Sequence, residues 1–223
     1  MKKIFIFSCL LVAGFLSNAQ VNYSGTYSYT NSIESKQIPK EITSVPGGVL
    51  VLMKMEGNTY RFWLDVLKGS PGFNRGETDG TIIFTGDTAS FDNTFENAES
   101  PCVLRFQKKG QTITIHSQST SFNCGFGNGV TADGVYRWKK QQVTLDNQWL
   151  KKQYPQASTF RVEDDQVELF RDESASQSFT PKLFFKKGDS FINITESEKN
   201  IYTEFIDAGG SFKYGWVRKL AIK

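Results

Sequence analysis

Short runs that alternate apolar and polar residues, separated by turn residues, recur along the chain between residues 22 and 140. Period-two alternation is typical of strands with one buried face, and no stretch here keeps the 3.6-residue period of an amphipathic helix. Many short strands without helical crossovers favour a closed or face-packed sheet, because closure hides strand edges. We therefore expect an all-β fold in which residues 20–140 form an antiparallel meander, as a small barrel or a sandwich. The expected strands are residues 23–30, 49–55, 59–67, 81–85, 88–91, 102–108, 112–116 and 135–139.

Two glycine-containing turns predict hairpins within this part. Gly86-Asp87 and Lys109-Gly110 each lie between two neighbouring expected strands. Glycine adopts the positive φ of a two-residue hairpin turn without steric cost. We expect each turn to join two paired strands.

The chain changes character at residues 141–159 and becomes β-rich again over residues 160–223. Asp146 can cap a short helix over residues 147–152, which Pro155 would end. This bridge contains aromatic and aliphatic side chains, so we expect it to pack rather than to swing as a flexible linker. The strands expected after it are residues 166–170, 182–185, 190–195, 201–206 and 212–217, with a turn at Gly209-Gly210.

The second part resembles a bacterial Src-homology-3-like (SH3-like) domain. The motifs that carry the resemblance are, in chain order, Val167-Glu168-Leu169-Phe170, Leu183-Phe184-Phe185-Lys186-Lys187-Gly188-Asp189, Tyr202-Thr203-Glu204-Phe205 and Gly215-Trp216-Val217. The resemblance covers residues 160–223, and it implies a small C-terminal barrel with a short final strand at residues 220–222. It also implies cell-wall peptide or protein as the class of ligand.

Three aromatic residues of this part, Tyr202, Tyr214 and Trp216, are the candidate ligand-binding residues. Aromatic surfaces line the grooves in which several peptide-recognition domains hold extended peptides. Alternation also places Phe212, Tyr214 and Trp216 on one face of a strand, which is equally typical of core packing.

The N-terminal residues have the organisation of a secretory signal peptide, residues 1–19. Lys2 and Lys3 precede a largely apolar run at residues 4–16, and Ser17-Asn18-Ala19 predicts cleavage before Gln20. The apolar run is shorter than the roughly 20 residues of a membrane-spanning helix. We expect an exported protein, periplasmic or secreted, with no transmembrane segment after cleavage. Cys9 lies inside the apolar run, so removal with the signal is favoured over lipid attachment.

The composition of the remaining chain excludes several classes of function. Removing the two signal lysines lowers the net charge from +3 to +1, which lacks the basic footprint of nucleic-acid binding. Cys102 and Cys124 are the remaining cysteines, and in an exported chain they predict a disulfide worth about 3 kcal/mol. The alternative, a metal site, is disfavoured because His116 is the only histidine. With a single histidine and two cysteines expected in a disulfide, the chain lacks the residues of a catalytic triad. We therefore expect neither an enzyme nor a cofactor.

Two turn-rich segments are candidate partner-binding loops. Residues 68–79 contain Phe73 and Arg75, and the glycine-rich residues 124–134 contain Gly127 and Asn128. Such loops either approach a partner closely or simply make tight turns. Glu77 and Asp79 would share one face of a strand, so a glycosidase pair is a further alternative.

A second, less specific similarity concerns the glycine-rich segment. Residues 124–130 and 132–136 are similar to the closing segment of small exported β-domains of unassigned function, some of them grouped loosely with lysozyme inhibitors. The sequence therefore predicts an exported, non-catalytic binding protein of the cell envelope that recognises cell-wall peptide or protein. The alternative is an inhibitor or immunity protein against a wall-degrading enzyme.

Overall fold

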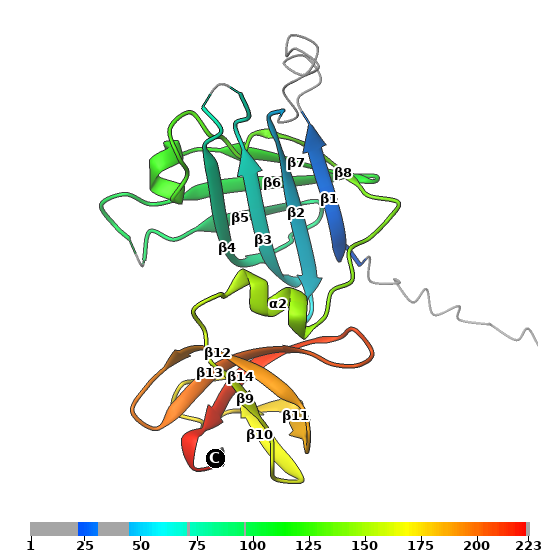
Figure 1. Ribbon diagram of the computed structural model, residues 1–223, viewed down its shortest axis with the longest axis vertical. Helices are drawn as coiled ribbons and strands as arrows, with labels where there is room; N and C mark the ends of the chain where they lie inside the picture. Colours follow the sequence, from blue (N-terminus) through cyan, green and yellow to red (C-terminus); the bar gives the residue numbers. More distant parts are fainter. Residues whose placement is uncertain (1–21, 31–44, 71, 96, 222–223) are drawn as a thin grey trace, which may run out of the picture.

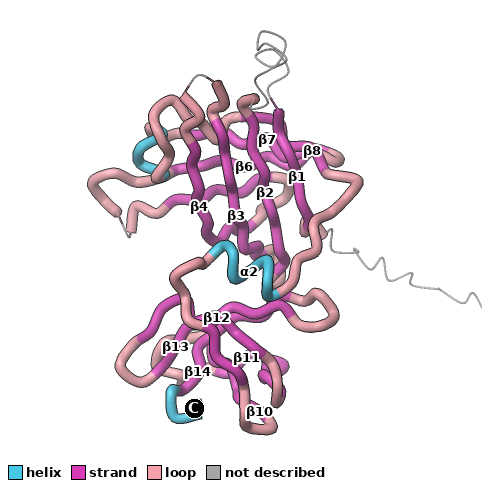
Figure 2. Tube along the Cα trace, viewed as in Figure 1, coloured by secondary structure: helices cyan, strands magenta, loops and turns pink. Residues whose placement is uncertain are grey.

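The computed structural model describes residues 22–30, 45–70, 72–95 and 97–221. The expected signal peptide at residues 1–19, including Cys9, lies outside the described residues. Within them the chain is nearly all β, which confirms the expected fold class. Two antiparallel sheets lie one beyond the other along the long axis, with one short helix between them (Figures 1 and 2). No helix in the described ranges has the length and apolar character needed to span a bilayer.

The first sheet has eight strands in the order β4-β3-β2-β1-β8-β7-β6-β5 and curls into a nearly closed barrel. Neighbours in the chain are neighbours in the sheet with one exception, β4 and β5, and β1 also pairs with β8. This extra pairing joins the two halves of the meander, and only the seam between β4 and β5 lacks a ladder. The strands are β1 (Gly25–Thr30), β2 (Gly47–Lys54), β3 (Thr59–Leu67), β4 (Arg75–Ile83), β5 (Thr88–Asp92), β6 (Val103–Lys109), β7 (Thr112–Ser117) and β8 (Gly134–Trp138).

The residues that form the core of this barrel are those that the alternation in the sequence puts on one face of each strand. On β3, the inward-facing residues Tyr60, Phe62, Leu64 and Val66 are each at most 2 % exposed. Fully burying a side chain such as Phe or Leu is worth about 1.5–3 kcal/mol. A slip of one residue would turn this whole row to solvent, so the pattern fixes the register with β2 and β4.

One of the two predicted hairpins differs from the structure. The turn at Lys109-Gly110 joins β6 and β7 in a regular ladder, as expected. The turn at Gly86-Asp87 forms, but only one bridge follows it, between Thr85 and Thr88. The Phe91 ring packs over Gly80, so β4 and β5 stay apart and pair with β3 and β6 instead.

The expected disulfide is present and joins Cys102 to Cys124. Cys102 directly precedes β6, and Cys124 ends the short 3-10 helix η1 (Ser121–Cys124). Both cysteines are buried in the barrel core. The bond therefore ties the chain segment that follows β7 to the start of β6, the end of β6 that pairs with the end of β7.

The second sheet has six strands in the order β11-β10-β14-β13-β12-β9. Its core consists largely of packed aromatic rings: Phe185 stacks on Phe191 at 4.9 Å and meets Phe205 edge-to-face at 5.2 Å, measured between ring centroids. Large rings compensate for the small size of this part, because each can bury about 150–250 Å². The strands are β9 (Thr159–Arg161), β10 (Gln166–Phe170), β11 (Ser178–Lys186), β12 (Ser190–Glu196), β13 (Asn200–Ile206) and β14 (Phe212–Arg218).

Two features of this sheet depart from the sequence expectations. β9 begins at the last residue of the expected bridge and was not predicted. A strand of three residues is too short to show the alternation of apolar and polar residues. The expected final strand is absent from residues 219–221, which form the 3-10 turn η2 (Lys219–Ala221). Leu220 is 99 % exposed, so no apolar face holds the chain in an extended conformation there.

A short helix, α2 (Asn147–Gln153), lies between the two sheets (Figure 2). Asp146 caps it, since its side-chain Oδ1 accepts a hydrogen bond from the Trp149 backbone N–H at 2.8 Å. Leu150 is fully buried in an apolar cluster that both sheets share. The helix and this cluster therefore dock the two sheets against each other. The other buried members are Val51, Met53 and Trp63 from the first sheet, and Ile192, Ile206 and Phe212 from the second.

Candidate functional site

The two loops singled out in the sequence lie side by side at the end of the first barrel that faces away from α2 (Figure 1). The Asn74 side chain donates a hydrogen bond from Nδ2 to the Asn128 carbonyl oxygen at 2.7 Å. The Gly127 N–H donates to the Arg75 carbonyl oxygen at 3.1 Å. We call residues 72–75 and 121–131 the loop pair. Segments about fifty positions apart in the chain thus form one surface.

Close packing under the loop pair depends on a glycine. A Cβ added at Gly76 would lie 2.4 Å from the ring of Phe126, which is itself 2 % exposed. Only a residue without a side chain lets the Phe126 ring reach the barrel wall at this point. The disulfide at Cys124 anchors the same segment two residues earlier.

Gly76→Ala should therefore destabilise the protein by about 1–3 kcal/mol, the usual cost of overpacking a close contact. Gly72→Ala is the matched control, since Gly72 is exposed and its nearest neighbour would sit 3.4 Å from the new Cβ. That variant should stay within about 0.5 kcal/mol of the wild type. Urea denaturation followed by tryptophan fluorescence measures both. Equal stability of the two variants would mean that Phe126 does not hold the loop pair.

The loop pair presents two exposed aromatic rings. Phe73 is 53 % exposed and Phe122 is 67 % exposed. Phe73 also has a φ of +51°, a left-handed conformation that is costly for a non-glycine residue. A hydrogen bond from its N–H to the Gly69 carbonyl oxygen at 2.7 Å holds it there. Exposed aromatic rings on a fixed backbone are typical of protein-binding surfaces.

Arg75 differs in role from the other loop candidates. The sequence placed it in a loop, whereas it begins strand β4, because β4 pairs with β3 along its whole length. Its Nε and Nη2 donate to the two carboxylate oxygens of Asp65 at 2.9 and 2.6 Å, and Nη2 also lies 2.8 Å from Glu77 Oε1. The hydrogen bonds to Asp65 are the main cause that raises the pKa of Arg75. Its side chain is thus fixed on the outer face of the barrel.

The candidate aromatic residues of the second sheet come together at its face toward the first barrel. Tyr202 and Trp216 are cross-strand partners with ring centroids 5.6 Å apart. Tyr214 packs edge-on against Phe179 at 5.5 Å. All three candidates are half-buried. The same face continues to Glu204, which contacts the first barrel.

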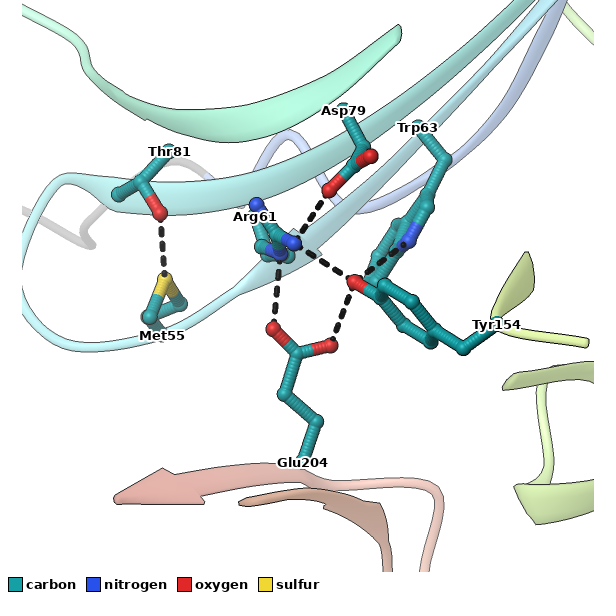
Figure 3. A network of polar contacts seen from close by, with 7 residues as sticks. All are labelled: Met55, Arg61, Trp63, Asp79, Thr81, Tyr154 and Glu204. Atoms are coloured by element: carbon teal, nitrogen blue, oxygen red, sulfur yellow. Dashed lines mark hydrogen bonds and ion pairs between the residues drawn. The ribbon is translucent and has the colours of Figure 1, made fainter. Parts of the chain in front are cut away.

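A buried polar cluster links the two sheets here and was not found from the sequence (Figure 3). The Tyr154 hydroxyl donates to Glu204 Oε2 at 2.9 Å and accepts from Arg61 Nη2 at 2.6 Å and from Trp63 Nε1 at 3.3 Å. Arg61 also pairs with Asp79. Side chains from β3, β4, β13 and the bridge therefore meet in one network.

The contact between Arg61 and Glu204 is electrostatic. Arg61 Nε lies 2.9 Å from Glu204 Oε1, yet neither atom makes a well-oriented hydrogen bond among the described residues. Glu204 is completely buried and the Arg61 side chain is 12 % exposed. Burial raises the pKa of the Glu204 carboxyl, and Arg61 opposes this only in part. For Arg61, burial disfavours the charge, but Glu204, Tyr154 and Asp79 together raise its pKa.

The remaining candidates for chemistry lie on two different strands, β7 and β4. His116 is exposed on β7, and its Nδ1 is 3.8 Å from Asp133 Oδ1. Glu77 and Asp79 share the outer face of β4, each near an arginine. In the part of the chain that the structure describes, no three His, Cys, Asp or Glu side chains gather as metal ligands would.

Comparisons with protein-family models, with curated proteins and with solved structures find no match to this chain.

Proposed function

We propose that this is a non-catalytic binding protein of the cell envelope that docks on a protein partner through the loop pair. The observation that carries the proposal is the joining of the two loops by Asn74 and Gly127, with Phe73 and Phe122 exposed beside the junction. Preorganised loops lose little entropy on binding, so exposed rings on them contribute most of their burial energy to affinity. An exported location rests on the signal-like residues 1–19.

The partner class that this surface fits is an enzyme with a concave cleft, and for an envelope protein a wall-degrading hydrolase is the leading case. A protruding, internally bonded loop pair can enter a cleft, as protease inhibitors do, with little change in its backbone. Wall peptide bound at Tyr202, Tyr214 and Trp216, as the SH3-like resemblance implies, is less supported. Those residues are half-buried, and Tyr214 packs against the shared apolar cluster.

The test uses the full chain, immobilised and incubated with an envelope extract of the native host. Phe73→Ser and Phe122→Ser should each weaken capture of the partner at least about tenfold, as expected for aromatic anchors. Ile83→Ser is the matched control, since Ile83 is 63 % exposed on the same barrel but at the other end of β4. The captured hydrolase should also lose turnover when the wild-type chain is added. Capture that is unaffected by both phenylalanine substitutions would refute the proposal.

A further inference from the structure

A groove runs along the outer face of β2, β3 and β4 and is closed on one side by α2. It encloses about 550 Å³, within the range of sites that hold small organic ligands. Val49, Val51 and Trp63 form its floor, and Trp149 and Gln153 of α2 form one wall. Trp149 packs edge-to-face on Trp63 with ring centroids 5.1 Å apart, and it remains half-buried. The groove thus has an apolar side built from fixed rings.

The opposite wall carries three carboxylates in fixed positions. Asp65 is the cross-strand partner of Glu77, and Trp63 is that of Asp79, so the acids follow one another along the outer face. Their side chains are 44, 65 and 42 % exposed, in the order Asp65, Glu77, Asp79. Arg75 holds the first two, as described above. A carboxylate offers about four lone-pair sites, so acceptor capacity remains after these contacts.

The charges around the groove are close to balanced. The lining contains the three acids and two cations, Arg75 and Lys152, and Arg61 behind it pairs with Asp79 as well as with Glu204. A balanced site attracts neither a phosphate nor a polycation strongly, because the field of each charge is cancelled nearby. It does offer both donors and acceptors at its rim. An uncharged ligand with many hydroxyl groups, each a donor and an acceptor, satisfies both kinds of partner.

We propose that this groove binds an uncharged oligosaccharide. One face of a pyranose ring is formed by C–H groups, which pack against the Trp149 ring, while the hydroxyl groups reach the wall formed by Asp65, Glu77 and Arg75. This binding is distinct from docking through the loop pair: Arg75 borders both surfaces, but the groove extends from it toward α2, whereas Phe73 and Phe122 are not among its lining residues.

The probes are three uncharged tetrasaccharides: β-1,4-linked N-acetylglucosamine, β-1,4-linked glucose and α-1,4-linked glucose. Binding is followed by the indole N–H resonances of Trp63 and Trp149, with Trp138 and Trp216 as internal references. At least one tetrasaccharide should shift the first two resonances and not the others. Glu77→Gln combined with Asp65→Asn should weaken that binding at least tenfold.

Asp164→Asn is the control variant, because Asp164 is exposed in the loop between β9 and β10. It should bind as the wild type does. No shift with any of the three sugars, or equal weakening by the control variant, would overturn the proposal. So would tighter binding of phosphate or of free arginine at the same resonances. Capture of a protein partner by the loop pair is measured separately and does not depend on the outcome.

Discussion

Arg61→Met is expected to lower the free energy of unfolding by about 3–5 kcal/mol near pH 8, because it leaves Glu204 buried without its cation. Glu204 is fully buried, and Tyr154 would be its remaining partner in the cluster (Figure 3). Buried ion pairs add little when intact, yet removing one member is costly since the other cannot regain water. Urea denaturation followed by tryptophan fluorescence, to which Trp63 of the cluster and its neighbour Trp149 contribute, measures the loss.

The cost of Arg61→Met depends on the charge of Glu204 and therefore on pH. Burial already raises the folded-state pKa of the Glu204 carboxyl above its unfolded value, and losing Arg61 should raise it further. A carboxyl with a raised folded pKa contributes stability that is lost as the pH rises from its unfolded pKa through its folded pKa. The cost of Arg61→Met should therefore be smaller near pH 5 than near pH 8.

Adding Glu204→Gln supplies the control. Glutamine keeps an acceptor for the Tyr154 hydroxyl and carries no charge, so the double variant should recover about half of the loss near pH 8. Its difference from the wild type should also grow less with pH than that of Arg61→Met. A cost that is the same at both pH values, with no recovery in the double variant, would show that Arg61 acts through packing alone.

Replacing Cys102 and Cys124 together by alanine is expected to cost about 3 kcal/mol, from the loop-closure entropy that returns to the unfolded chain. For a chain of this length, the loss corresponds to a fall in Tm of about 6–12 °C. The bond joins residues 22 positions apart and anchors the start of the glycine-rich segment. Partner capture by the loop pair should weaken as well, because its backbone becomes less preorganised.

Differential scanning calorimetry with and without a reductant measures this effect. The reductant should lower the Tm of the wild type toward that of the double variant, and it should leave the variant unchanged. An unchanged Tm in the double variant would mean that packing of Phe126 against Gly76 alone holds this segment.

The strands of this fold could be predicted where one face is buried and the other is not. Residues 59–67 and 166–170 alternate over most of their length, and both strands have the predicted bounds. The order of strands could not be predicted, because β1 pairs with β8 across more than a hundred residues. The predicted turn at Gly86-Asp87 forms, but the paired strands expected beyond it do not, because these turn residues report only the local backbone. The contact of Phe91 with Gly80, which separates the strands, is tertiary.

The sequence singled out residues 68–79 and 124–134, which overlap the loop pair, but it did not place them together and did not include Phe122. Their union depends on Asn74 and Gly127, whose partners lie more than fifty residues away along the chain. The buried cluster was missed, although one signal was present. Glu204 shares a strand face with Tyr202 and Ile206. A charged carboxylate that is buried on such a largely apolar face needs a cation as its partner. Only the docking of the two sheets shows that the cation is Arg61.

Site-specific photo-crosslinking tests the central claim, that the loop pair is the protein-binding surface. A photoreactive phenylalanine analogue is placed at Phe73, at Phe122 and, as a control, at Ile83, and each chain is irradiated in an envelope extract. We predict one adduct of defined mass from the first two positions and none from Ile83, with loss of the Phe122 adduct when Phe73→Ser is added. An adduct from Ile83 alone, or equal adducts from all three positions, would contradict the account.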